Sequence, residues 1–494
     1  MRFEGALQMK KRKKLLPLFL ALILAYSAVP AWAEPTAETP AEEVPETEPE
    51  LDPGLPEAYY TPIATDAVEG WPKGPAVWAD SAVVMDYDTG TILYAKEMDK
   101  QEYPASITKL MTVLLALENS SPEDRISFSE HAIWGIERDS SHIGIRVGEV
   151  LSMEDCLYGI LLESANEVCI AVAEHIAGSE EAFVQMMNDR AAELGCTNTH
   201  FVTTNGLHDD SHYTTAHDMA LIARAVWEHE YFREIESNQI HKIGFTNRTG
   251  EERWLAQSHK MMNSSTPYYY PDCVGGKTGF TDQALNTLVT YAQRDGRTLI
   301  CVNLRTNGWQ NYYDTQAMLN YGFEQFHQVT ADSGLSSPPD PSWLPEDPAA
   351  REAITVTVPS GVSAADLTTD SSLEGSVLTR RISYHGYTLG TLTTDLTDTL
   401  HALLRESPAI MAKQPASVSD AVKAITRPAP AKSGFFERIQ TAFAALPSWK
   451  YPLVIILTAL ILFYLIILIV QIRRRRRKKK RKKKYNKKKS GKRR

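Results

Sequence analysis

Cysteine is scarce in this sequence, with 5 residues among 494, and no two of them form a Cys-x-x-Cys pair. No His and Cys residues show the spacing of a structural zinc site either. These absences argue against a small disulfide-held scaffold and against a metal centre. An odd count leaves at least one thiol unpaired. We interpret the five as mostly buried, small apolar residues: Cys156, Cys169, Cys196, Cys273 and Cys301.

Acidic residues are missing from the last 22 residues, 473–494, which hold 18 of the 52 Lys and Arg residues. Between residues 34 and 472 the balance is reversed, with 28 basic and 60 acidic residues. A body with that charge repels phosphate groups, so we expect no nucleic-acid partner. The basic tail directly follows an apolar segment, and we interpret it as a membrane stop-transfer signal.

Long apolar runs occur only near the two ends of the chain. At the start, five basic residues, Lys10–Lys14, precede the apolar run Leu15–Val29 and the small-residue site Ala31-Trp32-Ala33. This order is typical of a secretory signal peptide, here 1–33, that is cut after Ala33.

The second apolar run, Pro452–Val470, contains no charged residue. At about 1.5 Å per residue it is long enough to cross a hydrocarbon core of roughly 30 Å. We therefore predict a transmembrane helix over 451–472. Positive charge stays in the cytoplasm, which places the tail inside and the acidic body outside. The expected location is the cell membrane, with one pass and the body on the extracytoplasmic side.

Composition divides the acidic body into parts. Pro, Glu, Thr and Ala dominate its start, which predicts a disordered spacer. A stretch rich in Ser, Pro and Asp predicts a linker, and alternating β-branched residues after it predict a small all-β domain. A Pro/Ala/Ser connector with an amphipathic stretch leads to the membrane. The predicted boundaries are spacer 34–74, first folded domain 75–328, linker 329–351, β domain 352–400 and connector 401–450.

Within the first folded domain, strand patterns stand at both ends and helical patterns in the middle. This arrangement predicts an α+β fold, in which one sheet carries flanking helices and a helical insertion. The predicted strands are Ala82–Tyr87, Thr91–Tyr94, Thr287–Ala292 and Thr298–Leu304, and the predicted helical stretches are Leu110–Leu117, 153–194 and Met318–Phe326.

A serine and a lysine, Ser106 and Lys109, stand three residues apart at the start of a helical pattern. Residues at this spacing share one helix face, so the amine can reach the hydroxyl. A serine hydroxyl is a weak nucleophile until a base removes its proton. A lysine can be that base where desolvation and neighbouring cations lower its pKa. Alone, such a pair is common by chance.

Two further triplets follow, Ser164-Ala165-Asn166 in the helical middle and Lys277-Thr278-Gly279 before the second hairpin. A second lysine beside the first would leave one amine as a base and the other to attract an anion. The expected ligand is therefore a peptide that ends in a carboxylate, with no metal or organic cofactor. In this order the motifs match the Ser-x-x-Lys, Ser-x-Asn and Lys-Thr-Gly set.

In these motifs the chain resembles the low-molecular-weight penicillin-binding proteins, the serine D-alanyl-D-alanine carboxypeptidases. The resemblance covers roughly 77–326, and it extends to Phe201–Leu207 and Tyr213–Ala216. It implies a penicillin-binding/β-lactamase-like fold and removal of the terminal D-alanine from peptidoglycan stem peptides that end in D-Ala-D-Ala. It also implies covalent inhibition by β-lactams.

The resemblance further implies a role for each motif residue. Ser106 would be the acylated nucleophile, Lys109 its general base, and Ser164 a proton carrier to the leaving amine. The implied substrate-binding residues are Asn166 for the backbone amide, Lys277 for positive charge, Thr278 for the terminal carboxylate, Gly279 for close approach, and Phe280, whose N–H would complete an oxyanion hole with that of Ser106.

Several residues near the motifs depart from the family pattern. Ala165 replaces a frequent glycine, Glu167 an aspartate, and Gly276 a β-branched residue, while 284–286 is less aromatic than usual. These changes leave the reaction class intact and bear on substrate preference.

Other polar residues near the motifs suggest further roles. His208, His212 and His217 invite a metal-site interpretation, but the resemblance implies a rim segment without metal. Glu163 and Glu167 are expected to be solvated or to cap a helix.

Three other functions share part of this pattern with a carboxypeptidase. A β-lactamase needs a Glu-x-x-Leu-Asn segment, and the nearest match, Glu252–Ala256, lacks the Asn and lies too near Lys277. A DD-endopeptidase stays open, because the same residues serve both reactions. A non-catalytic sensor of wall peptides or β-lactams is disfavoured, because a binding module needs no activated nucleophile.

Overall fold

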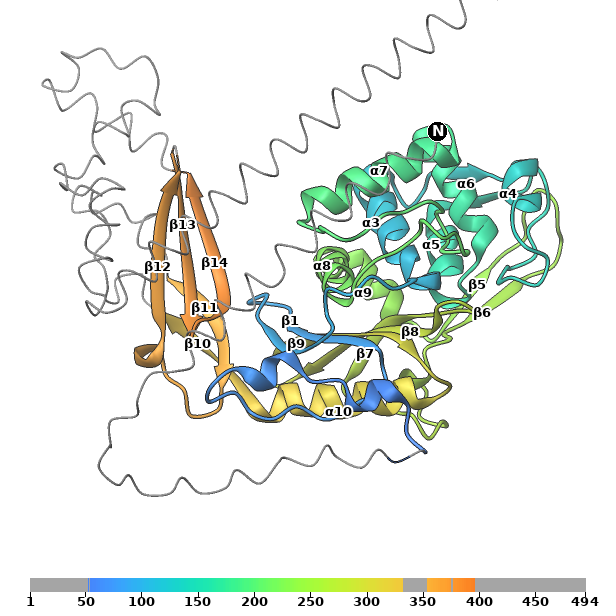
Figure 1. Cartoon of the computed structure of the whole chain (residues 1–494). Helices are drawn as coiled ribbons and strands as arrows, with labels where there is room; N and C mark the ends of the chain where they lie inside the picture. Colours follow the sequence, from blue (N-terminus) through green and yellow to red (C-terminus); the bar gives the residue numbers. More distant parts are fainter. Residues whose placement is uncertain (1–51, 53, 332–352, 375, 396–494) are drawn as a thin grey trace, which may run out of the picture. The chain divides into compact units, whose positions relative to one another are not determined.

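The computed structural model describes a large central part of the chain (Figure 1). The described residues are 52, 54–331, 353–374 and 376–395. Four predicted parts lie outside them: the signal peptide 1–33, the connector 401–450, the transmembrane segment 451–472 and the tail 473–494. Among the helices that are described, none combines the length and the apolar character that crossing a membrane requires.

A five-stranded antiparallel sheet, in the order β2-β1-β9-β8-β7, organises this part (Figure 1). Its strands are β1 Ser81–Asp86, β2 Ile92–Lys96, β7 Cys273–Thr281, β8 Leu285–Arg294 and β9 Arg297–Thr306. The β8–β9 hairpin turns at Asp295 and Gly296, whose φ angles of 52° and 82° suit a tight two-residue turn. The four strands predicted from the sequence are confirmed.

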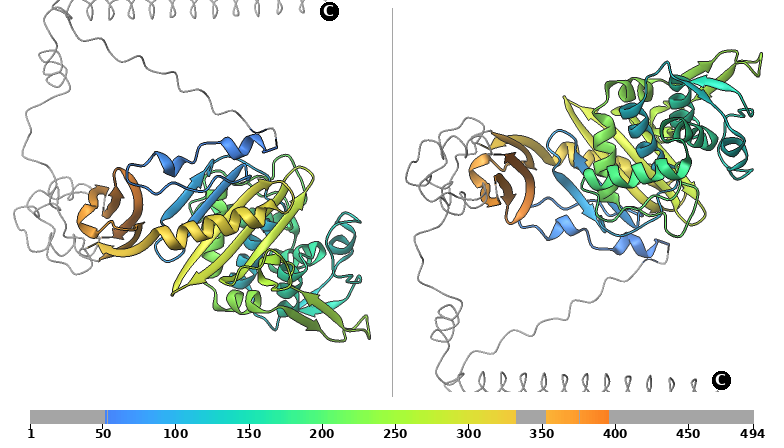
Figure 2. Two further views of the ribbon diagram at one scale, coloured as in Figure 1. Left: turned by 90° about the horizontal axis from the view of Figure 1, so that it is seen from below. Right: turned by 90° about the horizontal axis from the view of Figure 1, so that it is seen from above.

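Helices cover both faces of the sheet. Side chains alternate between the faces along each strand, so Val83 and Val302 join one apolar cluster while Val84 and Cys301 join another. Helix α10, Gln310–Gln325, crosses the second face (Figure 2). It includes most of the predicted helix Met318–Phe326, but Phe326 itself begins a strand.

The insertion between β2 and β7 covers the first face and is mainly helical. Its helices are α3 Lys109–Asn119, α4 Glu130–Trp134, α5 Met153–Leu162, α6 Asn166–Ala177, α7 Glu180–Glu193, α8 Ala216–Trp227 and α9 Glu230–Ser237. Two strand pairs accompany them, β3 Arg125–Ser127 with β4 Val150–Ser152, and β5 Ile240–Ile243 with β6 Arg253–Ala256. The predicted helical stretches 110–117 and 153–194 are confirmed.

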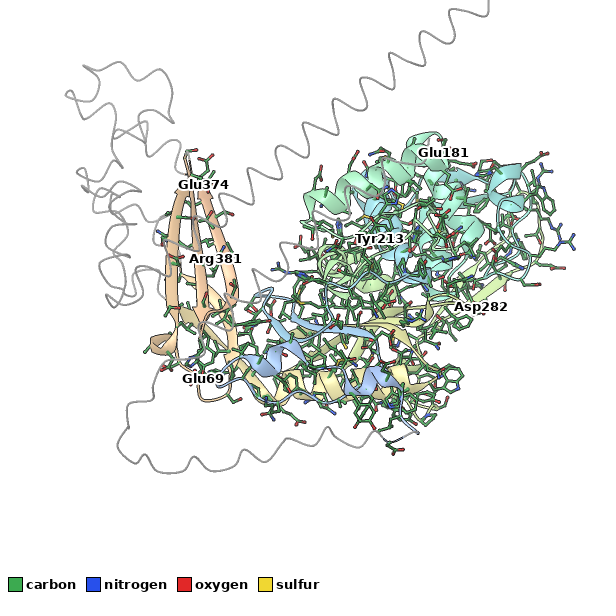
Figure 3. The ribbon with its side chains drawn as sticks, in the orientation of Figure 1. Glu69, Glu181, Tyr213, Asp282, Glu374 and Arg381 are labelled. Carbon is green, nitrogen blue, oxygen red and sulfur yellow. The ribbon has the colours of Figure 1, made fainter. Side chains whose placement is uncertain are left out.

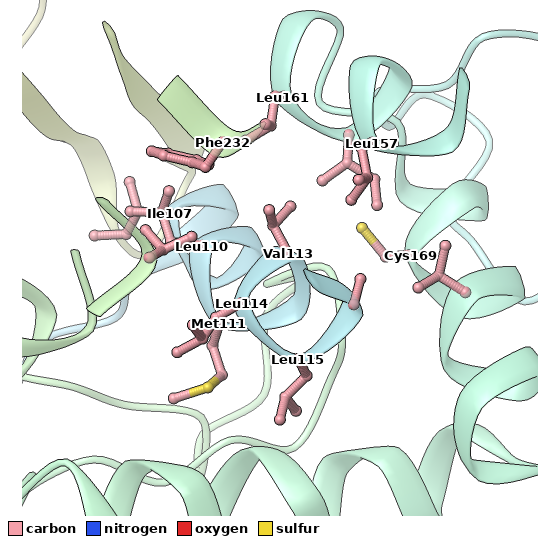
Figure 4. Close-up of a cluster of buried hydrophobic side chains, with 14 of the residues drawn as sticks. Ile107, Leu110, Met111, Val113, Leu114, Leu115, Leu157, Leu161, Cys169 and Phe232 are labelled. Atoms are coloured by element: carbon pink, nitrogen blue, oxygen red, sulfur yellow. The ribbon is translucent and has the colours of Figure 1, made fainter. Parts of the chain in front are cut away.

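Helix α3 lies in the middle of the insertion and is buried on all sides. Each residue from 109 to 116 is buried, and Leu110, Val113 and Leu114 contact the surrounding helices (Figure 4). At about 25 cal/mol per Å² of apolar surface, each such side chain contributes on the order of 2 kcal/mol to folding. A helix fixed in this way gives the residues at its start a defined position.

The prediction of a disordered spacer up to residue 74 was wrong for its final part. Residues 57–60 and 64–67 form short 3-10 helices. Trp71 is only 5% exposed, and its indole N–H donates to Leu93 O at 2.9 Å. A buried aromatic ring with a satisfied donor fixes the chain against β2, which the Pro- and Glu-rich composition before it concealed.

The predicted boundary between the first domain, the linker and the β domain also needs correction. Strand β10, Phe326–Ala331, pairs with β11, Ile354–Pro359, so one two-stranded sheet spans the predicted linker. A separate three-stranded sheet follows, formed by β12 Thr368–Glu374, β13 Val377–Tyr384 and β14 Tyr387–Asp395. Arg381, on β13, is exposed (Figure 3).

These β strands share apolar and polar contacts with the main sheet. Val356 and Leu389 belong to the same buried cluster as Val84. Thr357 Oγ1 donates to the buried Asp86 carboxylate at 2.9 Å, and Thr91 Oγ1 donates to Leu389 O at 2.7 Å. The β region is thus continuous with the α10 side of the core.

Candidate active site

Ser106 lies in a strained turn that leads into helix α3. The turn is a 3-10 helix, Ala105–Thr108, and Ala105 has a φ of 51°, in the left-handed region. Thr108 Oγ1 donates to Ala105 O at 2.8 Å and so closes the turn. Such a backbone conformation costs about 1–3 kcal/mol and persists only when its surroundings enforce it.

Gly206 and His212 help to hold the turn at Ala105 in this conformation. Gly206 has a φ of 83°, and a Cβ there would lie 1.9 Å from Ala105 O. His212 is buried, its Nε2 is 2.9 Å from Thr108 Oγ1, and its Nδ1 accepts the N–H of Val202 at 2.9 Å. Burial lowers the pKa of His212 to about 3, so the ring is neutral and Nε2 carries the proton. Neither residue's role was predicted.

Lys109 is fully buried, one helical turn after Ser106. Its Nζ donates to Ser106 Oγ at 2.9 Å, to Asn166 Oδ1 at 2.7 Å and to Asn205 O at 2.5 Å. Burial lowers the pKa of Lys109 to about 8, because desolvation disfavours the ammonium form. The amine can therefore lose its proton near neutral pH while it stays in contact with the hydroxyl.

Ser164 and Lys277 meet across the cleft from separate elements. Lys277, on β7, donates to Ser164 Oγ at 3.0 Å and to Thr278 O at 2.9 Å. Ser164 lies between α5 and α6 with a left-handed φ of 59°. Burial, and next the charge of Lys109, lower the pKa of Lys277 to about 7. The structure thus brings residues 113 positions apart into contact.

Strand β7 lies directly beside the Ser106 turn. A Cβ on Gly279 would lie 2.9 Å from Ser106 N and 2.3 Å from Thr287 Oγ1, so only glycine permits this approach. Thr287 Oγ1 also donates to Pro104 O at 2.8 Å, which joins the sheet to the turn. Thr278 is partly buried, whereas the Phe280 side chain is 60% exposed.

These residues surround one open cleft of about 810 Å³. Ser106, Ser164 and Asn166 line it from the helical side, and Thr278, Gly279 and Phe280 from the strand side. Asp282 follows β7 at the cleft (Figure 3). A nucleophile, two amines and an exposed strand edge suit a peptide that lies along β7 and is attacked at a carbonyl.

Glu167 is not the solvated residue that the sequence suggested. Its side chain is 2% exposed, and Oε1 accepts the N–H of Ile143 at 2.8 Å. Burial raises its pKa. Glu163 Oε1 instead accepts the N–H of Ala256 at 2.8 Å, at the cleft margin. Glu163 follows α5 and accepts from the backbone of β6, whereas Glu167 stands in the first turn of α6 and also accepts from its own backbone N–H.

The sequence drew attention to a metal site among the histidines and to the five cysteines, and the described residues show neither a metal-binding group nor a disulfide. Within the described residues, no group of three or more His, Cys, Asp or Glu side chains is arranged to hold a metal ion. All five cysteines, which lie in the described part, are unpaired. Burial raises the pKa of Cys169, near Lys109, to about 12, so this thiol stays protonated and inert.

Comparison with known proteins identifies the family. A family model described as D-alanyl-D-alanine carboxypeptidase matches residues 69–308. D-alanyl-D-alanine carboxypeptidase DacB2 of Mycobacterium tuberculosis is 30% identical over 269 residues, which cover 53% of this chain and 87% of that protein. The chain therefore belongs to the D-alanyl-D-alanine carboxypeptidase family of serine peptidases.

Two further similarities agree with this assignment. D-alanyl-D-alanine carboxypeptidase DacF of Bacillus subtilis is 33% identical over 255 residues, and the match covers 50% of this chain and 63% of that protein. The crystal structure of penicillin binding protein 5 from Haemophilus influenzae has a TM-score of 0.53 at 24% identity, covering 65% of this chain and 97% of that one. The predicted penicillin-binding-protein-like α+β fold is confirmed.

Proposed function

We propose that this protein is a serine D-Ala-D-Ala carboxypeptidase that removes the terminal D-alanine from peptidoglycan stem peptides. One observation carries the proposal: the buried Lys109 amine lies 2.9 Å from Ser106 Oγ, and Lys277 contacts Ser164, which lines the same cleft. This arrangement supplies a base, a nucleophile and a charge that attracts a carboxylate within one site.

In the proposed reaction, neutral Lys109 takes the proton of Ser106 while Oγ attacks the penultimate carbonyl. The N–H groups of Ser106 and Phe280 stabilise the oxyanion, and Asn166 holds the backbone amide of the peptide. Ser164, in contact with Lys277, passes a proton to the leaving D-alanine amine. Water then hydrolyses the acyl-enzyme.

Lys277 and Thr278 orient the substrate through its terminal carboxylate. A charge-assisted hydrogen bond from a buried cation contributes about 1.5–3 kcal/mol, which favours peptides that end at this residue. A β-lactam carries a carboxylate and a reactive carbonyl, so it is expected to acylate Ser106 and to block the cleft. No metal or organic cofactor enters this scheme.

We also propose that the enzyme works on the extracytoplasmic side of the cell membrane. The proposal rests on the sequence alone: a predicted signal peptide over 1–33, a predicted transmembrane helix over 451–472 and a basic tail over 473–494. An anchored enzyme of this kind would act on the wall polymer close to the membrane surface.

The decisive experiment measures D-alanine released from a peptide that ends in D-Ala-D-Ala, together with covalent labelling by a fluorescent penicillin. We expect both with the intact protein and neither with Ser106→Ala. The variant Ser120→Ala, outside the cleft, is the matched control. Absence of both release and labelling in the intact protein would favour a non-catalytic sensor, and preferential cleavage of a cross-linked dimer would favour a DD-endopeptidase.

A further inference from the structure

A buried carboxylate, Glu236, lies behind the strand that carries Lys277. It belongs to helix α9 and is 0% exposed. Its Oε2 accepts the N–H of Gly276 at 2.8 Å, immediately before Lys277. Within the described residues, Oε1 has no hydrogen-bond partner. A buried carboxyl with one free oxygen is costly unless it stabilises something nearby.

Gly275 makes this approach possible, and Gly276 allows close contact between β7 and the neighbouring β8. A Cβ on Gly275 would lie 2.8 Å from Glu236 Cβ, and a Cβ on Gly276 would lie 2.1 Å from Val289 O. The pairing of β7 with β8 also shifts register between Cys273 and Gly275. The bare backbone at these positions lets the Glu236 carboxylate reach the N–H of Gly276.

The charges around Glu236 are few. Lys277 on β7 is the only cation that influences its pKa among the described residues, and Gln257 Nε2 lies 3.5 Å from Oε2. Three further titratable groups lie close to Glu236 or to the backbone that it contacts: Cys273 on β7, Tyr291 on β8 and His259 beside Gly276. These three stay neutral near pH 7, because burial raises the pKa values of Cys273 and Tyr291 and lowers that of His259.

We propose that Glu236 is a positioning residue for the reaction: it fixes the backbone at Gly276, and its negative charge favours the positively charged form of Lys277. The inference rests on the proposed function, in which Lys277 binds the substrate carboxylate. Burial raises the pKa of Glu236 to about 7, and the negative charge of Glu236 acts to raise the pKa of Lys277. The charged forms of Glu236 and Lys277 therefore stabilise each other, whereas desolvation disfavours both.

Glu236→Gln tests the charge separately from the hydrogen bond, because the amide oxygen still accepts from Gly276. The matched control is Glu234→Gln, on the same helix with an exposed side chain. In full-length protein labelled with ¹³C at lysine Cε, an NMR titration follows the Lys277 signal, assigned by its loss in Lys277→Arg. We expect the pKa of Lys277 to fall by about one unit in Glu236→Gln and to stay unchanged in Glu234→Gln.

Kinetic measurements provide a second test of the negative charge on Glu236. Because the pKa of Lys277 lies below that of Lys109, lowering it further reduces the fraction of enzyme with neutral Lys109 and charged Lys277, so the maximum of kcat/KM for D-alanine release should fall about tenfold in Glu236→Gln. An unchanged Lys277 pKa in folded Glu236→Gln would overturn the inference. If that variant does not fold, Glu236→Asp keeps the charge, and a lowered Lys277 pKa there would overturn it. The titration needs no activity, so it separates this inference from a failure of the proposed function.

Discussion

Behind each of the two walls of the cleft lies a buried lysine amine, and the two amines have different surroundings. Lys109, on the helical wall, donates to three oxygens, none of which belongs to a carboxylate. Lys277, on the strand wall, donates to Ser164 and has Glu236 behind its backbone. Burial lowers both pKa values, to about 8 and about 7. The comparison teaches that neighbouring charge, added to burial, separates the two amines: the positive charge of Lys109 gives Lys277 the lower pKa, although Glu236 acts to raise it.

The two lysines are also linked. The positive charge of Lys109 is one cause of the low pKa of Lys277. When Lys109 gives up its proton, the charged form of Lys277 becomes more favourable, and a bound carboxylate adds to this effect. At these pKa values a single proton on the pair lies mainly on Lys109, so the form that the proposed reaction needs, with neutral Lys109 and charged Lys277, is a minority that a bound carboxylate would favour.

The sharpest way to break this comparison is to replace each lysine by methionine, which keeps most of the side-chain volume. Lys109→Met should lower kcat for D-alanine release about 10³-fold, because it removes the base. Lys277→Met should mainly raise KM, by about 10- to 100-fold, because it removes a charge that binds substrate. Steady-state kinetics measure both. Equal losses of kcat in the two variants would contradict the division of roles.

The turn that carries Ser106 also depends on Gly206, because only glycine fits beside Ala105 O. Gly206→Ala should lower the free energy of unfolding by about 3 kcal/mol and slow penicillin acylation, because its Cβ would collide with Ala105 O. Gly178→Ala is the control: its φ is 84°, and nothing lies within 4 Å of its Cβ position. It should cost only about 1 kcal/mol. Equal losses in chemical denaturation would exclude the collision.

The pH dependence of kcat/KM should be bell-shaped. The rate rises with pH as Lys109 loses its proton, and it falls with pH as Lys277 loses its own. From pKa values of about 8 and about 7, the maximum should lie between these two pH values. Beyond each limb the rate should change about tenfold per pH unit. A flat profile between pH 6 and 9, roughly one unit beyond each value, would show that neither lysine titrates during the reaction.

The smallest effect is expected away from the cleft, where β11 meets β1. Thr357→Val removes the hydrogen bond to Asp86 and should cost about 1 kcal/mol of stability. Kinetic constants for D-alanine release should not change, because this contact lies on the α10 side of the sheet. Thr355→Val, on the same strand and hydrogen-bonded only to the exposed Thr330, serves as the control for denaturation. A change in kcat would link the β region to catalysis.

Much of the fold follows from local patterns in the sequence. The nearly continuous apolar runs in Ala82–Tyr87 and Thr298–Leu304 reflect burial on both faces of a sheet, and the spacing of Ser106 and Lys109 places them on one helix face. Contact between Ser164 and Lys277 could not be derived from spacing, because it depends on how the insertion folds over the sheet. The family motifs supplied it instead.

Other parts of the site left little trace in the sequence. Glu236 stands in an ordinary amphipathic helix, and only its burial behind two glycines marks it out. Asn205-Gly206 does read as a turn signal, but its contacts with Lys109 and Ala105 arise from tertiary structure. The ordered segment that ends at Trp71 was missed because one aromatic residue outweighs the polar composition around it.

Ser106 and Ser164 both depend on left-handed backbone at a residue that carries a side chain, Ala105 before Ser106 and Ser164 itself. Each such residue opposes folding by about 1–3 kcal/mol, a sizeable part of the 5–15 kcal/mol that holds a typical domain together. A sequence optimised for stability alone would place glycine at these two positions. The active conformation is therefore imposed by the rest of the fold, and any mutation that loosens α3 or β7 is expected to relax the serines before the domain unfolds.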